Sequence, residues 1–314
     1  MNKFTFRGNK TLKGLLLLQL AAAAPGLATA TTLFSDDFKS GYTWSSLLTT
    51  LQSTVQSQLG SKWQYIDWAS GHGAIDTWPA DSNKKAYRIQ YVRSDDLDVM
   101  AHKFDPSHTN GTSRPKEIYV QWKEYRSSTF DCGPSKDWRI TAYRANEYGG
   151  ASFPFVDLYG GFGNTNPSGV QPCNSVGLNI QGYGASQPGD PNTITMANYT
   201  FPLGTVKTVQ LHLKMNSPNN ADGAAEMWVD GTKIMGRTNV KISPDGWSQV
   251  YIDAFQLGMS ATNGGQAFQS TSYIWRTDVV IADTFIGGTT TTTPPPTTTS
   301  APAAPSSLNV QPVQ

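Results

Sequence analysis

The chain has 314 residues, which is enough for one large domain or two small ones. Its 24 Lys and Arg and 23 Asp and Glu give a formal net charge of +1, which excludes a globally basic protein that binds nucleic acid through phosphates. Charged residues make up only 15 %, against the usual ~25 %, and Gly, Tyr, Trp and small polar residues take their place. This composition is typical of secreted β proteins with long polar loops.

Residues 1–30 have the features of a secretory signal peptide. Lysines and an arginine, with no acid, precede the apolar run 15–24, and small residues at 28–30 form a cleavage site before Thr31. The apolar run is too short to span a bilayer. We therefore expect a secreted protein that starts at Thr31 and has no membrane partner.

One helix and a series of strands are expected after the signal peptide. Apolar residues recur at every fourth position in 47–59, and Gly60 follows, which predicts a short N-terminal helix. Alternating segments bounded by turn residues predict strands at 87–93, 117–126, 138–144, 153–159, 176–181, 207–216, 225–230, 247–253 and 279–285. Asp230-Gly231 predicts a two-residue hairpin. We expect an all-β fold, a two-sheet jelly-roll or concanavalin-like β-sandwich.

The domain organisation follows from a change in composition near the end of the chain. Residues 31–288 show no internal repeat or linker, so we expect them to form one β-sandwich domain. A Thr/Pro-rich stretch at 289–305 cannot bury a core and predicts an extended linker. The segment 306–314 resembles the opening of a fibronectin type III module, and the alternative is a disordered tail.

Cys132 and Cys173 are the two cysteines of the chain. Both lie in loops that contain Gly and Pro, and an exported chain meets an oxidising compartment, so we expect them to form a disulfide. They have too few neighbouring ligands for a zinc site. We expect no required cofactor, although calcium could bind if the segments Asp36-Asp37-Phe38 and Asp283-Thr284-Phe285, from opposite ends of the domain, pair. The alternative is that these acids only solubilise edge strands.

Three expected strands have an outward face of cations, amides and tyrosines with few acids. Alternate residues of a strand share a face, and the outward residues are Tyr119, Gln121, Lys123, Tyr125, Arg139, Tyr143, Gln210, His212 and Lys214. Such a face suits a polymer of sugar acids, because aromatic rings stack on sugars while Arg and Lys bind carboxylates. The alternative is an exposed sheet that has this composition by chance.

Several segments occur in a familiar order: Glu117-Ile-Tyr-Val-Gln-Trp-Lys-Glu-Tyr-Arg126, Lys136-Asp-Trp-Arg-Ile140, Leu211-His-Leu-Lys-Met-Asn216, Asp222-Gly223 and Trp228-Val-Asp-Gly231. Over about 117–288 they resemble jelly-roll polysaccharide lyases, the alginate- and glucuronan-cleaving families. The resemblance implies β-elimination of a uronate polymer on the concave sheet. Alginate-cleaving members carry a Gly-Gly-Lys-type segment and a later Tyr-x-Tyr. Here Pro134-Ser135-Lys136-Asp137 and a single Tyr143 or Tyr159 stand instead.

Uronate β-elimination needs a group that neutralises the carboxylate, a base for the C5 proton and an acid for the leaving oxygen. We expect Arg139 to neutralise the carboxylate, because its guanidinium is bidentate. Tyr143 or Tyr125 is expected to move the proton, and Lys123 and His72 are further catalytic candidates. The residues expected to bind an acidic polysaccharide are Tyr119, Gln121, Gln210, His212, Lys214 and Trp228. His72 could instead be an exposed loop residue, and Trp228 could simply pack.

Other functions are less well supported by the residues present. A glycoside hydrolase needs paired carboxylates, but the chain has four Glu in all, and Glu117 and Glu124 fall on opposite faces of one strand. No Gly-x-Ser-x-Gly motif indicates a serine nucleophile. The main alternative is a non-catalytic, lectin-like module for acidic glycans. We expect a monomer that does not bind nucleic acid.

Overall fold

The computed structural model describes residues 30–39, 63, 65–68, 73–91, 98–104, 114–132, 137–144, 156–163, 173–181, 197–243, 250–258 and 272–287. Every regular element within these residues is a strand, so the expected all-β fold is confirmed. The expected helix at 47–59, the signal peptide up to residue 29, and the segments 289–305 and 306–314 lie outside the described residues. Within the described part, no helix has the length and hydropathy needed to cross a membrane.

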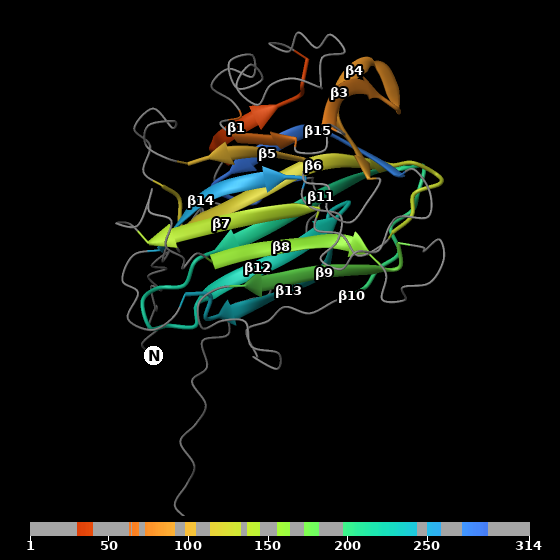
Figure 1. The fold of residues 1–314 in the computed structure, drawn as a ribbon. Coiled ribbons are helices and arrows are strands. Elements are labelled where there is room, and N and C mark those ends of the chain that lie inside the picture. Colours follow the sequence, from red (N-terminus) through yellow and green to blue (C-terminus); the bar gives the residue numbers. More distant parts are fainter. Residues whose placement is uncertain are drawn as a thin grey trace, which may run out of the picture.

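The described strands form two antiparallel sheets, which Figure 1 shows stacked on each other. The eight-stranded sheet contains β13 (Thr232–Val240), β12 (Gly223–Val229), β11 (Val206–Lys214), β6 (Glu117–Arg126), β15 (Ser272–Ala282), β4 (Asp81–Tyr91) and β3 (Gly73–Trp78), in that order. Its eighth strand, β1 (Thr32–Asp36), pairs with the second half of β15. The seven-stranded sheet contains β10 (Ala197–Asn198), β9 (Ser175–Gln181), β8 (Val156–Gly163), β7 (Trp138–Arg144), β14 (Val250–Leu257), β5 (Asp98–Lys103) and β2 (Tyr65–Trp68), in that order.

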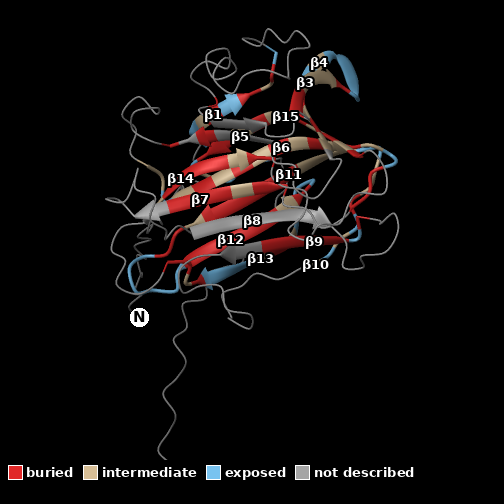
Figure 2. Cartoon of the chain, in the orientation of Figure 1, coloured by how far each residue is buried: buried red, intermediate tan, exposed pale blue. Residues whose placement is uncertain are grey.

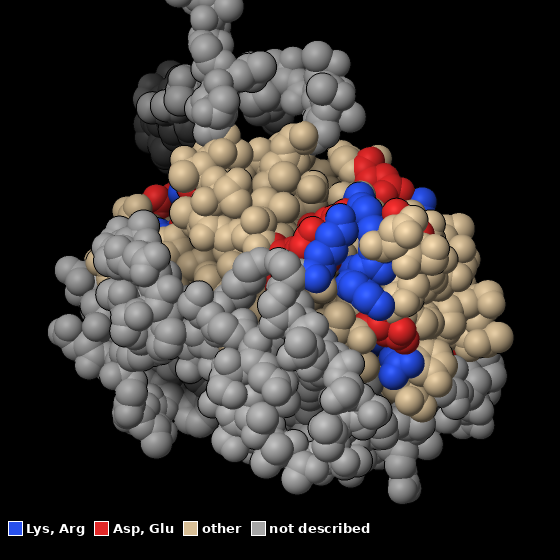
Figure 3. All heavy atoms as spheres, turned by 90° about the horizontal axis from the view of Figure 1, so that it is seen from above, with Lys and Arg blue, Asp and Glu red and all other residues tan. Residues whose placement is uncertain are grey.

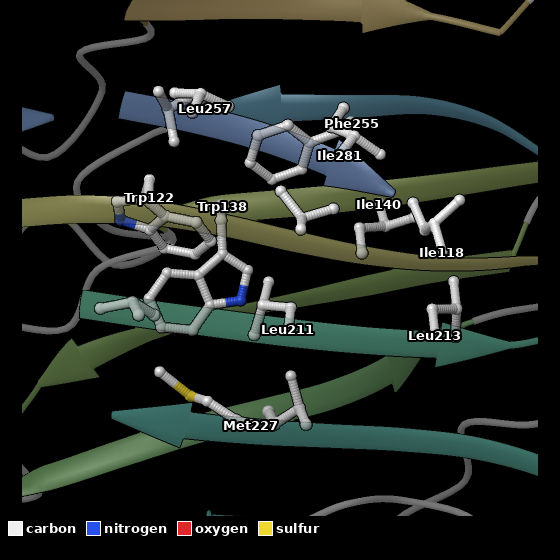
Figure 4. Close-up of a cluster of buried hydrophobic side chains, with 14 of the residues drawn as sticks. Ile118, Trp122, Trp138, Ile140, Leu211, Leu213, Met227, Phe255, Leu257 and Ile281 are labelled. Carbon is white, nitrogen blue, oxygen red and sulfur yellow. The ribbon is translucent and has the colours of Figure 1, made fainter. Parts of the chain in front are cut away.

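The core lies between the sheets, where strand alternation places the large apolar side chains. The ring of Trp122 on β6 lies 5.8 Å from that of Trp138 on β7 and 5.9 Å from that of Phe255 on β14. Figure 4 shows these side chains meeting between the two layers, and Figure 2 shows buried residues along the strands of both sheets. Burying side chains of this size contributes about 1.5–3 kcal/mol each, so these contacts hold the sheets together.

One end of this core contains charges instead of apolar groups. Glu124 on β6 accepts hydrogen bonds from Nε of Arg126 at 2.8 Å and from Nε of Arg276, on β15, at 2.9 Å. Arg126 also binds Asp137, just before β7 in the other sheet, at 2.5 Å. All four side chains are buried. Burial alone would raise the pKa of Glu124, but the guanidinium groups of Arg276 and Arg126 outweigh it and lower the pKa to about 2.

The last strand differs from the expected segment 279–285, because β15 starts seven residues earlier and contains a bulge. Its pairing with β6 changes register between Thr277 and Val280, and Asp278 within the bulge has a φ of 51°. The bulge shifts the alternation of buried and exposed residues, so a strict period of two could not detect the whole strand. The hairpin expected at Asp230-Gly231 is confirmed, since φ values of 49° and 76° fit a type I′ turn.

The expected disulfide between Cys132 and Cys173 is present, with the two Cα atoms 4.9 Å apart. It links the segment after β6, in one sheet, to the segment before β9, in the other. Replacing both cysteines by Ser should lower the free energy of unfolding by about 2–4 kcal/mol, because the bond closes a loop between residues 41 apart. Denaturant unfolding of the oxidised protein and the variant measures this loss. An unchanged midpoint would contradict it.

Glu124→Gln should cost about 3–5 kcal/mol, because it leaves two buried guanidinium groups without the carboxylate between them. Asp230→Asn is the matched control, since it removes an acid whose side chain is 47 % exposed and should change stability little. Urea denaturation of the three proteins at neutral pH compares the losses. Equal midpoints for Glu124→Gln and wild type would show that the interior pairs add no stability.

Candidate functional site

The residues expected to form one site are divided between the two outer faces of the sandwich. Trp122 on β6 and Trp138 on β7 point at each other in the core. Successive side chains of a strand point to opposite faces. Lys123 and Arg139, which directly follow the two tryptophans, therefore point outward on opposite sides of the molecule. The expectation of a single face that combines Arg139 with the residues of β6 and β11 is wrong, because β7 belongs to the other sheet.

On the seven-stranded sheet, Arg139 occupies the middle of a row of polar residues. Backbone register places Tyr159 of β8 on one side of Arg139 and Gln256 of β14 on the other, and Asn179 of β9 lies next to Tyr159. Opposed residues of neighbouring strands belong to the same face of a sheet. With strands ~4.8 Å apart, the row extends over roughly 14 Å.

A pair of opposed tyrosine positions lies further along strands β7 and β14. Tyr143 on β7 is opposed by Tyr251 on β14, and Nζ of Lys116 lies 5.0 Å from the ring centroid of Tyr251. Tyr143 lies four positions after Arg139, which is roughly 13 Å along the strand. The structure thus places Arg139, Gln256, an asparagine position and several tyrosine positions on one sheet. Gln256 and Asn179 were missed from the sequence, because pairing between distant strands cannot be detected from local alternation.

On the eight-stranded sheet, the residues expected to bind the polymer contact one another or neighbouring glutamates instead. His212 contacts Glu226 through Nδ1 at 2.8 Å and Glu117 through Nε2 at 2.9 Å, and its ring stacks on that of Tyr119 at 4.1 Å. Gln121 donates to the side-chain oxygen of Gln210 at 3.2 Å. The expected contact of His212 and Gln210 with a polymer is not available, because only 4 % and 3 % of their surfaces are exposed.

The segment that follows β15 helps to cover this part of the sheet. The ring of Phe285 lies 5.9 Å from that of Tyr119 and 5.4 Å from that of Trp228. Gln121 also donates to the backbone oxygen of Ile286 at 3.4 Å. Trp228 therefore packs in an aromatic cluster. Lys214 is half-buried at the end of β11, and His72 lies outside the described residues.

The carboxylates around His212 favour its protonated form. Burial lowers its pKa, but hydrogen bonds to Glu117 and Glu226 outweigh burial and raise the pKa above its ordinary value. The hydrogen bond from His212 lowers the pKa of Glu117. Burial opposes the same effect on Glu226, where hydrogen bonds from His212 and Lys233 still lower the pKa. Burial and these carboxylates raise the pKa of Tyr119 to about 12, which makes it a poor base near neutral pH.

The acids of the two segments considered for calcium, Asp36 and Asp283, do not meet. The first and last described strands, β1 and β15, do pair. Asp36 is opposed by Val279, however, while Asp283 lies at the other end of β1. Asp36 accepts a hydrogen bond from Nε1 of Trp63 at 2.7 Å, and Asp283 accepts one from the backbone N–H of Thr31 at 2.9 Å. Among the described residues, no group of three or more His, Cys, Asp or Glu could hold a metal ion.

The His212 cluster should make stability depend on pH in a defined direction. Folding raises the pKa of His212. Its contribution to the free energy of unfolding is therefore complete below the pKa of the unfolded state, about 6.5, and is lost as the pH rises through the pKa of the folded state. The lowered pKa values of Glu117 and Glu226 give contributions that are lost as the pH falls below about 4.3. The stability difference between wild type and His212→Gln should therefore be largest between these limits.

Urea midpoints of both proteins measured from pH 4 to pH 9 would test this dependence. A difference that stays constant from pH 6 to pH 9 would show that His212 is not held as a cation.

Known proteins resemble this chain in fold. No protein-family model matches the chain, and no curated protein matches its sequence. Among solved structures, alginate lyase Aly36B in complex with an alginate trisaccharide matches with a TM-score of 0.56 and 15 % identity, covering 81 % of this chain and 99 % of that one. The marine PL-14 alginate lyase from Aplysia kurodai matches with a TM-score of 0.57 and 14 % identity, covering 80 % and 99 %.

Alginate lyase vAL-1 from Chlorella virus also matches, with a TM-score of 0.52 and 14 % identity, covering 75 % of this chain and 99 % of that one. At such identities the likeness is one of fold, and it extends over nearly the full length of each matched lyase. The chain thus has the jelly-roll sandwich fold of these polysaccharide lyases, as its resemblance to them implied.

Proposed function

We propose that the protein is a secreted polysaccharide lyase that cleaves a uronate polymer by β-elimination on the outer face of its seven-stranded sheet. The observation that carries the proposal is the position of Arg139 between Tyr159 and Gln256 in adjacent strands. The three matched structures named above are alginate lyases, which supports the same class of substrate. The disulfide is compatible with export.

The reaction requires the groups that this row supplies. A uronate carboxylate that pairs with Arg139 has its charge neutralised, which acidifies the proton on C5. A tyrosine oxygen removes this proton, the bond between C4 and the bridging oxygen breaks, and a C4–C5 double bond forms. The leaving oxygen takes a proton from a tyrosine hydroxyl. We assign these proton transfers to Tyr159 or Tyr143, and the positioning of the chain to Gln256 and Asn179.

The outer face of the other sheet is less suited to this chemistry. Lys123 binds Asp278 at 2.7 Å, and Tyr125 packs edge to face against Trp78 and Trp275. Both lie on the opposite side of the core from Arg139, so neither can act on the sugar that Arg139 binds. A non-catalytic module for acidic glycans is the second candidate, since the same row of Arg and amide groups could bind such a glycan without cleaving it.

The test is ultraviolet absorbance of the unsaturated product, with the purified protein incubated with alginate, glucuronan, heparan-type and pectic polymers. At least one polymer should give a steady rise in absorbance. Arg139→Lys keeps the charge but loses the bidentate fork, so kcat should fall much more than KM rises. Tyr159→Phe or Tyr143→Phe should lower kcat about 10²-fold or more, whichever tyrosine transfers the proton.

Arg237→Lys on β13 is the matched control, because that arginine is exposed on the other sheet and should leave turnover unchanged. If Arg139→Lys turns over a confirmed substrate at the wild-type rate, the site assignment is wrong. If a polymer binds but no product absorbs, the protein is a binding module.

A further inference from the structure

A second group of aromatic and cationic side chains lies on the outer face of the eight-stranded sheet. Trp275 of β15 is its centre, opposed by Tyr125 of β6 on one side and by Arg88 of β4 on the other. The ring of Trp275 lies 5.6 Å from that of Tyr125 and 5.5 Å from that of Tyr273. The guanidinium carbon of Arg88 lies 5.4 Å from the ring centroid of Tyr273.

Two lysines adjoin these rings at the bulge of β15. Nζ of Lys123 lies 2.7 Å and Nζ of Lys84 3.5 Å from the same carboxylate oxygen of Asp278. Lys123 precedes Tyr125 by two residues on β6, so both point outward from the same face. We refer to Arg88, Tyr125, Tyr273 and Trp275 together with Lys84 and Lys123 as the aromatic–lysine patch.

The cations of the patch keep contact with solvent and outnumber the acids beside them. The side chains of Lys84, Lys123 and Arg88 are 32 %, 41 % and 28 % exposed. Among the residues that the structure describes, Asp278 and Asp76 are the carboxylates that pair with these three cations, so one positive charge is left over there. Figure 3 shows Lys and Arg gathered beside acids on one side of the upper surface. A ligand with carboxylates complements this surplus.

We propose that the aromatic–lysine patch binds a uronate polymer without cleaving it. Sugar rings would lie against Trp275 and Tyr273, and uronate carboxylates would pair with Lys123 and Lys84. The substrate class rests on the proposed function. The patch is not expected to catalyse elimination, because its two tyrosines pack against Trp275. It lies on the opposite side of the sandwich from Arg139, so one chain could contact two polymer segments.

The binding experiment uses the Arg139→Ala protein, in which the row on the other sheet has lost its carboxylate ligand. Gel electrophoresis through alginate or polyglucuronate measures the retardation of the protein, and hydroxyethyl cellulose serves as the neutral polymer. The acidic polymers should retard Arg139→Ala, and added salt should weaken the effect. Lys84→Gln with Lys123→Gln should then raise the dissociation constant about fivefold or more.

Lys207→Gln is the matched control, because Lys207 also binds a carboxylate at 2.7 Å but is opposed by the buried Glu124, so it starts from the other face of the sheet. It should leave the retardation unchanged. Trp275→Leu should weaken binding without changing the charge, and thermal unfolding shows whether this variant still folds.

The proposal is overturned if the two Lys→Gln changes and Lys207→Gln have equal effects, if Arg139→Ala does not bind the acidic polymers, or if hydroxyethyl cellulose binds equally well. The absorbance assay on wild type separates this result from the proposed function. Absorbing product without binding by Arg139→Ala refutes the patch alone. Binding that depends on the patch, without product, refutes only the lyase.

Discussion

Glu124 lies between two arginines inside the sandwich, and the position of β7 depends on this arrangement. Arg126 uses one nitrogen for Glu124 and another for Asp137, the residue just before β7. The backbone oxygen of Asp137 also accepts a hydrogen bond from Gly258 at 3.0 Å. Since Arg139 follows Asp137 by two residues, the interior charges help to fix the place from which the proposed catalytic guanidinium projects.

A buried charge network does not by itself make a fold more stable, because replacing all of its members by well-packed apolar groups often costs little free energy of unfolding. Its geometry does specify which strand of one sheet lies over which strand of the other. Three of its four members lie on the neighbouring strands β6 and β15, and the fourth, Asp137, directly precedes β7 of the opposite sheet. The disulfide lies next to it, with Sγ of Cys132 3.6 Å from Arg126. We infer that charges and covalent bond together define the relative position of the sheets at this end.

Local patterns predicted those parts of the fold that local forces determine. The strands 117–126 and 138–144 and the Asp230-Gly231 turn could be predicted, because alternation and turn residues can be recognised in short stretches of sequence. The disulfide could be predicted because the chain has two cysteines and an expected export signal. The division of the polar residues between two faces could not. Each strand alone shows which of its residues alternate, but only pairing across distant segments decides to which sheet it belongs. The bulge at Asp278 also interrupted the period that would have revealed all of β15.

The beginning and the end of the described sandwich lie side by side. The backbone N–H of Thr31 donates to the carboxylate of Asp283, and the N–H of Asp283 donates in turn to the backbone oxygen of Thr31 at 3.3 Å. A short peptide could therefore join these ends without disturbing either sheet, because closing a small gap costs little chain entropy. The chain could then be opened at the exposed hairpin after β12. Circular permutants of this sandwich should accept new termini there, far in sequence from the row around Arg139.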